Sequence, residues 1–86
     1  MAESTLVVSL IHTVRTVAHI PPSVAIQPET RLVEDLHIDS LDLVGIYLKV
    51  QDDHGVVIDE ADLPRLGRIA DLASYVEASR QAVSAA

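Results

Sequence analysis

Apolar side chains recur at the three- and four-residue spacing of an α-helix in three separate segments of this 86-residue chain. Ile20-Pro21-Pro22 closes the first segment, because proline lacks an amide hydrogen and disfavours helix in the residue before it. No segment shows the sustained alternation of a β-strand. The sequence therefore predicts a single all-α domain over residues 1–86, with main helices at about 4–18, 40–54 and 68–80.

A long stretch without regular spacing joins the first two helices, from Pro21 to Asp39. Loops of this length in small domains are usually functional or held by buried apolar side chains. A fourth, short helix is expected at about 59–64, after the second main helix ends at Gly55. The expected anchors of the long loop are its apolar residues Val24, Ile26, Leu32, Leu36 and Ile38.

Charge is concentrated in the middle of the chain. The sequence has 13 acidic and 6 basic residues, and residues 35–62 hold eight of the acidic ones with Lys49 as the single base. This distribution favours basic partners and raises their encounter rate. It disfavours nucleic acid as a partner, because nucleic acid selects basic surfaces and stacking aromatic residues.

Several classes of protein are disfavoured by what the sequence lacks. It contains no cysteine, which excludes disulfides and thiolate metal sites, and two histidines without nearby acids, His12 and His19, rarely form a metal centre. No apolar run is long enough to span a membrane, and no basic residue precedes the first apolar segment as in a secretion signal. We therefore expect a cytoplasmic protein with no membrane contact and no metal.

The second main helix is expected to have two apolar faces, at 100° per residue. One face consists of Leu43, Ile46, Tyr47 and Val50. The roughly opposite face consists of Leu41, Val44 and Leu48. A three-helix core needs only one apolar face, so the second is either more core or an exposed docking strip. One such strip, with a large charge of one sign, favours a monomer.

The tetrapeptide Asp39-Ser40-Leu41-Asp42 stands where the long loop meets this helix. Asp39 as the N-cap, with Asp42 three residues later, has the pattern of a capping box. Many helices begin in this way. Taken alone, the tetrapeptide predicts only an ordinary helix start.

The wider sequence is similar to the acyl carrier proteins. The string from Leu32 to Val44, with Asp-Leu at 35–36 and Asp-Ser-Leu at 39–41, resembles the segment around the family's attachment serine. Residues 57–63 look like the family's short third helix, and residues 69–76 look like its last helix. The resemblance covers roughly residues 4–80. It implies a four-helix bundle with three main helices, one short helix and a long first loop.

By this resemblance, Ser40 receives 4′-phosphopantetheine from coenzyme A, through a separate phosphopantetheinyl transferase. The protein then holds an acyl, polyketide or aminoacyl group as a thioester and catalyses no reaction itself. Asp39 is expected to orient the transferase or its metal, and Leu41 to lie under the arm. Chemistry supports the choice of Ser40, since a hydroxyl at a helix start is exposed and the first-turn amides favour a phosphodiester there. The thiol of such a protein belongs to the arm, which fits the lack of cysteine.

The same resemblance assigns a role to the second apolar face of the helix. Loading and processing enzymes with basic patches are expected to dock there. The expected docking residues are Asp39, Leu41, Asp42, Val44, Leu48, Asp52 and Asp53, of which Asp42, Asp52 and Asp53 steer basic partners.

The chain also departs from many members of the family. The differences are at His37, Gly45, Gln51, His54 and Arg68. They favour a specialised carrier in a polyketide, aminoacyl or other secondary pathway over the partners of fatty-acid synthesis. Because the chain ends close to the domain, we expect a discrete protein that meets free-standing enzymes.

A second hypothesis comes from a different class of protein. An unmodified acidic helical adaptor would bind a protein partner through Leu41, Val44 and Leu48 and would leave Ser40 unaltered. An enzyme is disfavoured, because Ser40 lies in no Gly-x-Ser-x-Gly elbow and the sequence shows no catalytic base, nucleophile pair or cofactor loop.

Overall fold

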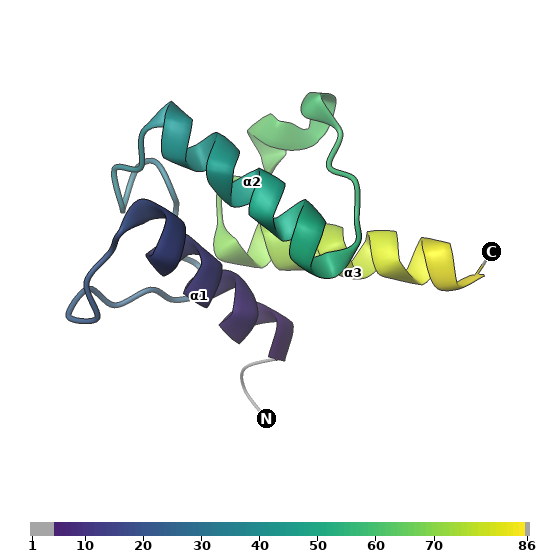
Figure 1. Cartoon of the computed structure of the whole chain (residues 1–86), viewed down its shortest axis with the longest axis horizontal. Coiled ribbons are helices and arrows are strands. Elements are labelled where there is room, and N and C mark those ends of the chain that lie inside the picture. Colours follow the sequence, from purple (N-terminus) through teal and green to yellow (C-terminus); the bar gives the residue numbers. More distant parts are fainter. Residues whose placement is uncertain (1–4, 86) are drawn as a thin grey trace.

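The computed structural model describes residues 5–85, with side chains described as far as residue 80. The regular structure of these residues consists of three α-helices and one short 3-10 helix (Figure 1). In chain order they are α1 (Thr5–Ala18), α2 (Ser40–His54), η1 (Glu60–Arg65) and α3 (Ile69–Ala85). Within residues 5–85 the only strand-like pairing is an isolated antiparallel bridge between Arg31 and Arg68. The prediction of an all-α bundle with three main helices and one short helix is confirmed.

The ends of the helices follow the sequence signals closely at α2 and less closely elsewhere. α2 has the predicted bounds, and Gly55 follows it at φ 64°, the left-handed conformation that ends many helices. η1 and α3 each begin one residue later than predicted. α3 also continues to Ala85, because no proline or glycine follows residue 80 to end it. The predicted first helical residue, Ser4, and the last residue, Ala86, lie outside the described residues.

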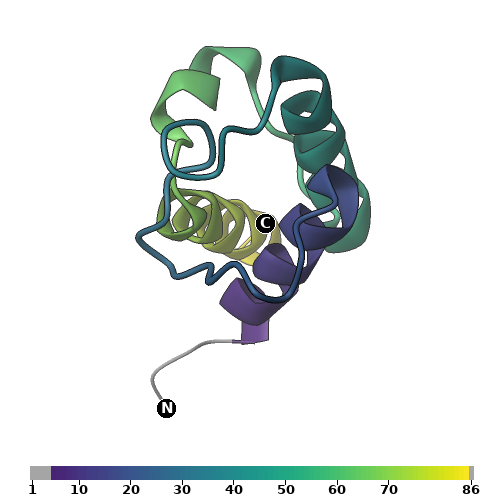
Figure 2. The ribbon, with the colours of Figure 1, turned by 90° about the vertical axis from the view of Figure 1, so that its left-hand side faces the viewer.

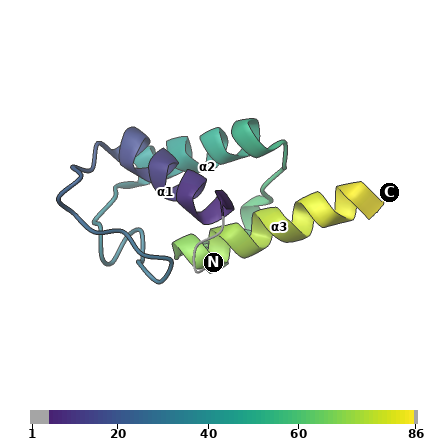
Figure 3. The ribbon, with the colours of Figure 1, turned by 90° about the horizontal axis from the view of Figure 1, so that it is seen from below.

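The helices pack through one apolar core. Its members from the three α-helices are Leu6, Leu10, Val14, Ile46, Tyr47, Val50, Ile69, Leu72 and Val76. α1 contacts both α2 and α3. The last turns of α3 extend beyond the other two helices (Figures 1 and 3).

Gly45 lies where α1 and α2 approach each other. A Cβ atom placed on Gly45 would lie 3.2 Å from Cγ1 of Val17, which is tighter than an ordinary van der Waals contact. Glycine inside a helix costs about 1 kcal/mol relative to alanine. The close approach of the two helices gives a physical reason for a glycine at this position.

The long loop between α1 and α2 is held by buried apolar side chains. Ile26, Leu32 and Ile38 are buried, and Leu36 is partly buried against the core, as the sequence predicts. Val24 is 37% exposed, so the prediction that it anchors the loop is wrong. The reason is local: the Val24 amide bonds to the Pro21 carbonyl at 3.1 Å in a turn that stands at the surface.

The backbone of the loop finds its hydrogen-bond partners at the start of α3. The Leu32 amide donates to the Gly67 carbonyl at 2.8 Å, and the Ala70 amide donates to the Pro28 carbonyl at 2.8 Å. Figure 2 shows the loop passing in front of the first turn of α3. Residues far apart in the sequence therefore fix the path that leads to α2.

Asp35 closes a turn of this loop. Its Oδ2 accepts hydrogen bonds from the Arg31 amide at 2.8 Å and from Arg31 Nε at 3.3 Å, and its Oδ1 accepts one from Nη2 at 3.1 Å. These hydrogen bonds from Arg31 hold the pKa of Asp35 below its ordinary value.

The lowered pKa of Asp35 predicts a contribution to stability that depends on pH. This contribution is present above the unfolded pKa, near about 3.9, and is lost as the pH falls through the lower, folded pKa. We expect the free energy of unfolding in urea to fall more steeply with acid in the parent than in Asp35→Asn. Arg31→Gln should flatten the acid dependence in part, since it removes the guanidinium bonds and leaves the bond from the backbone amide of residue 31. Equal slopes in all three proteins would contradict the prediction.

Candidate functional site

Ser40 is the first residue of α2, and its side chain is exposed. Asp39 before it is the N-cap, with φ −77° and ψ 169°, and its Oδ1 accepts a hydrogen bond from the Asp42 amide at 2.9 Å. Ile38, two residues before Ser40, is buried at 7% exposure. The chain leaves the core and enters the helix within two residues, which holds the Ser40 side chain outside.

The turn that precedes this helix start contains a left-handed residue, His37, at φ 56°. Its amide donates to the Val33 carbonyl at 3.0 Å, and the Ile38 amide donates to the Leu32 carbonyl at 3.2 Å. This conformation costs an L-residue about 1–2 kcal/mol, although histidine adopts it more often than most residues do. The turn reverses the chain so that Ile38 reaches the core while Ser40 remains at the surface.

The two apolar faces of α2 have different environments. The first face is in the core: Ile46, Tyr47 and Val50 are buried, and Leu43 is partly buried. The second face is at the surface, where Leu41 is 81%, Val44 52% and Leu48 58% exposed. We call Leu41, Val44 and Leu48 the apolar strip. Their exposure shows that the strip is not core.

Acidic side chains surround the apolar strip unevenly. Asp52 is exposed and falls on the same line of α2 as Leu41 and Leu48, at 100° per residue. Asp53 accepts a hydrogen bond from Lys49 Nζ at 2.9 Å, and this carboxylate raises the pKa of Lys49. The charge of Asp53 is therefore partly neutralised, which leaves Asp52 as the exposed acid of α2 on the line of the strip.

A cleft between α2 and η1 adjoins the apolar strip. Its volume is about 280 Å³. Its lining residues are Val44, Tyr47, Leu48, Gln51, Ile58, Glu60 and Leu63. Val44 and Leu48 thus belong both to the strip and to the cleft, so an arm attached at the start of α2 would run along apolar surface toward a cavity.

Side chains of α2 fix both ends of the segment that forms the far wall of the cleft. Oε1 of Gln51 accepts a hydrogen bond from the Ile58 amide at 2.7 Å, before η1. The Tyr47 hydroxyl donates to the Leu66 carbonyl at 3.2 Å, after η1, and burial raises the pKa of Tyr47. The sequence predicts neither residue as part of the site, because helical periodicity places a residue on a face without showing what lies opposite.

The described part of the chain has neither a metal-binding cluster nor a membrane-spanning helix. Within it, no three histidine, aspartate or glutamate side chains lie close enough together to hold a metal ion. None of the described helices has the length and hydropathy that crossing a bilayer requires.

Comparison with known proteins identifies the class. Residues 8–76 match the family described as phosphopantetheine attachment site. An acyl carrier protein of Thermotoga maritima is 41% identical over 49 residues, which is 57% of this chain and 60% of that protein. The meromycolate extension acyl carrier protein of Mycolicibacterium aurum is 33% identical over 76 residues, 88% of this chain and 77% of that protein. That of Mycolicibacterium smegmatis is 35% identical over 72 residues, 84% and 72% of the two chains.

The chain belongs to the phosphopantetheine-attachment family of carrier proteins. Within that family it belongs with the acyl carrier proteins. Members of this family are carriers rather than catalysts, and the prosthetic group of the domain is covalent 4′-phosphopantetheine.

The residues at the start of α2 fit this prosthetic group. A covalent arm needs a hydroxyl that stands outside the protein, and Ser40 offers one at a helix N-terminus, where amide hydrogens and the helix dipole favour a phosphodiester. The exposed Leu41 and the apolar strip would give an arm attached at Ser40 an apolar surface to lie on. When bound, the group supplies the thiol that the cysteine-free chain lacks.

The role of Asp39 as the N-cap predicts a stability effect separate from any effect on function. Asp39→Ala should lower the free energy of unfolding by about 1 kcal/mol, because the Asp42 amide loses its acceptor. Asp39→Asn should lower it much less, since asparagine caps as well as aspartate does. Urea unfolding of the three proteins measures both changes. An equal loss in the two variants would show that the charge of Asp39, and not its capping bond, stabilises the helix.

Proposed function

We propose that Ser40 carries 4′-phosphopantetheine, and that the modified protein presents an intermediate as a thioester to a series of biosynthetic enzymes. The observation that carries the proposal is the exposed Ser40 side chain at the first position of α2, directly before the most exposed residue of the apolar strip, Leu41. The Asp39 cap supports it, because a capped helix start holds the hydroxyl in one place.

The modification is a phosphoryl transfer. The Ser40 oxygen attacks the pyrophosphate phosphorus that bears the pantetheine arm of coenzyme A. A new phosphorus–oxygen bond forms at Ser40, the pyrophosphate bond breaks, and 3′,5′-ADP leaves. The serine proton passes to a base of the transferase. In this proposal the free carboxylate oxygen of Asp39 orients the transferase or its metal, while the other oxygen remains on the Asp42 amide.

We propose that partner enzymes dock on the apolar strip. An exposed apolar patch with a polar rim is typical of a transient protein interface. Asp42 and Asp52 would then draw basic patches toward Ser40, an effect that weakens as salt rises. The first partner is the phosphopantetheinyl transferase, and the later ones are enzymes that load and process the cargo. In this proposal the protein acts as a monomer in the cytoplasm, where coenzyme A is available.

The proposal extends to the chemical class of the group that the arm carries. Acyl, polyketide and aminoacyl groups all form thioesters on such an arm. The relatives named for meromycolate extension support an acyl chain. The largely apolar lining of the cleft beside α2 agrees with an apolar chain.

Intact-mass measurement tests the attachment site. After incubation with coenzyme A and a broad-specificity phosphopantetheinyl transferase, the parent should gain the mass of one phosphopantetheine and Ser40→Ala should gain none. Ser74→Ala, which removes an exposed serine of α3, is the matched control and should be modified as the parent is. A parent protein that stays unmodified, or a Ser40→Ala variant that gains the group, would overturn the proposal. The first result would favour the unmodified adaptor.

Substitution in the apolar strip tests docking. Leu41→Gln should lower kcat/KM for the transferase by about fivefold or more, the effect of losing about 1 kcal/mol at an interface. Val57→Gln is the control, because Val57 is 82% exposed and lies outside the strip. Both substitutions are at the surface and should leave the urea midpoint nearly unchanged. If the two variants lose activity equally, or neither loses any, the strip is not the docking surface.

A further inference from the structure

The wall of the cleft formed by η1 is weakly packed. None of the residues of η1 is fully buried, and the helix contains Pro64. On one side of η1 lies the cleft with Leu63 and Glu60 in its lining. On its other side a surface hollow of about 310 Å³ lies between the end of η1 and α3, lined by Arg65, Leu66, Asp71, Ser74 and Tyr75. With space on both sides, η1 is held by the partly buried side chain of Leu63 and by polar contacts with α3.

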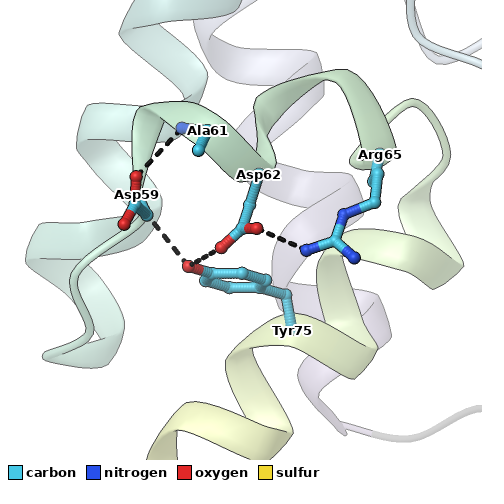
Figure 4. A network of polar contacts seen from close by, with 5 residues as sticks. All are labelled: Asp59, Ala61, Asp62, Arg65 and Tyr75. Atoms are coloured by element: carbon cyan, nitrogen blue, oxygen red, sulfur yellow. Dashed lines mark hydrogen bonds and ion pairs between the residues drawn. The ribbon is translucent and has the colours of Figure 1, made fainter.

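Tyr75 of α3 supplies the polar contacts that hold the first turn of η1. Its hydroxyl accepts a hydrogen bond from the Asp59 amide at 3.1 Å and donates one to Oδ2 of Asp62 at 2.9 Å. Figure 4 shows the ring of Tyr75 rising from α3 so that its hydroxyl lies between Asp59 and Asp62. One hydroxyl thus ties both ends of a turn to a helix that contributes no residue to the lining of the cleft.

The neighbouring side chains orient this contact. Oδ1 of Asp59 accepts a hydrogen bond from the Ala61 amide at 2.9 Å, and the other carboxylate oxygen of Asp62 bonds to Nη2 of Arg65. Hydrogen bonds from Tyr75 and Arg65 lower the pKa of Asp62, so its carboxylate is ionised at neutral pH. A hydrogen bond to an ionised acceptor is stronger than one between neutral groups.

Because the cleft is small, the position of η1 determines how long a chain the cleft can hold. At about 280 Å³, the cleft is at the lower limit of pockets that enclose small molecules, which span about 300–1,000 Å³. A short apolar chain fits with η1 in place, whereas a longer one needs η1 to move away from α2. A ligand that fits only when η1 has moved away from α2 must break the contacts that hold η1 in place, so its affinity depends on the strength of those contacts.

We propose that the hydrogen bond between Tyr75 and Asp62 is a latch that sets how readily η1 moves away from α2, and that it thereby limits the length of apolar chain the cleft shelters. Tyr75 is then a positioning residue that determines cargo length from outside the cleft. That the cleft holds cargo rests on the proposed function, whereas the hydrogen bond between Tyr75 and Asp62 is present in the unmodified protein.

Hydrogen exchange in the unmodified protein tests the latch. The reporters are the amides at the two ends of η1: Asp62 donates to the carbonyl of the N-cap Asp59, and the C-cap Leu66 donates to the Leu63 carbonyl. Their exchange is compared with that of the core amides of Ile46 and Val50. In Tyr75→Phe, exchange of the two η1 amides should be about tenfold faster relative to the core amides, as expected for the loss of a hydrogen bond to a charged group. Glu77→Gln is the control, since Glu77 is an exposed residue of the same helix that takes no part in the two bonds of Tyr75, and it should change exchange far less.

Two results of this experiment would overturn the latch. One is equal protection of η1 in the parent and in Tyr75→Phe. The other is an equal acceleration of all amides, which would mean that Tyr75 stabilises the whole fold and not η1 in particular.

Loaded protein tests the effect on cargo. Parent and Tyr75→Phe are each loaded with octanoyl- or hexadecanoyl-phosphopantetheine, and the gain in melting temperature over the unloaded protein is measured. In the parent, the longer chain should stabilise no more than the shorter one, while in Tyr75→Phe it should stabilise more. The same difference between chains in both proteins would contradict the proposed limit on length. A protein that cannot be loaded at Ser40 would instead refute the proposed function and would leave the exchange result standing.

Discussion

Burial of the apolar side chains of the long loop is the interaction on which the rest of the structure depends. Leu32 is fully buried and Ile38 nearly so, although neither belongs to a helix. The loop backbone completes its hydrogen bonds with residues at the start of α3. Since buried amides must be paired, the loop takes its path only when α3 is in place. The position of Ser40 is thus a product of the whole core, and not only of the capping signal beside it.

The two apolar faces of α2 differ in what they contribute to stability. The face with Ile46 and Val50 contributes to the core, where each buried side chain stabilises the fold by about 1.5–3 kcal/mol. The opposite face leaves Leu41 and its neighbours in water, which stabilises nothing in the isolated protein. Exposed apolar patches of this kind are typical of protein interfaces, which agrees with the proposed docking of partner enzymes there.

The parts of the structure that could be predicted from the sequence are those set by local signals. The bounds of α2 follow from Asp39 at one end and Gly55 at the other, and the all-α class follows from the spacing of apolar residues. Periodicity alone did not decide whether the second face of α2 is covered, because that depends on where other helices lie. Val24 has the composition of an anchor, yet a turn of its own holds it at the surface.

The cleft and the contacts of Tyr75 had no local signal at all. Tyr75 lies in α3, whereas its partners Asp59 and Asp62 lie at the start of η1, 16 and 13 positions earlier in the chain. Its place on the last helix predicts only that it borders the core. Such contacts depend on the angle at which two helices pack, which a single sequence does not reveal.

The extension of α3 beyond the other helices has a practical consequence. The end of α3 and the start of α2 lie at opposite ends of the molecule (Figure 1). A tag, fluorophore or solid support joined to the C-terminus is therefore directed away from Ser40 and the approach to the apolar strip. A sample immobilised in this way keeps the start of α2, where we propose that the arm is attached, open to partner enzymes.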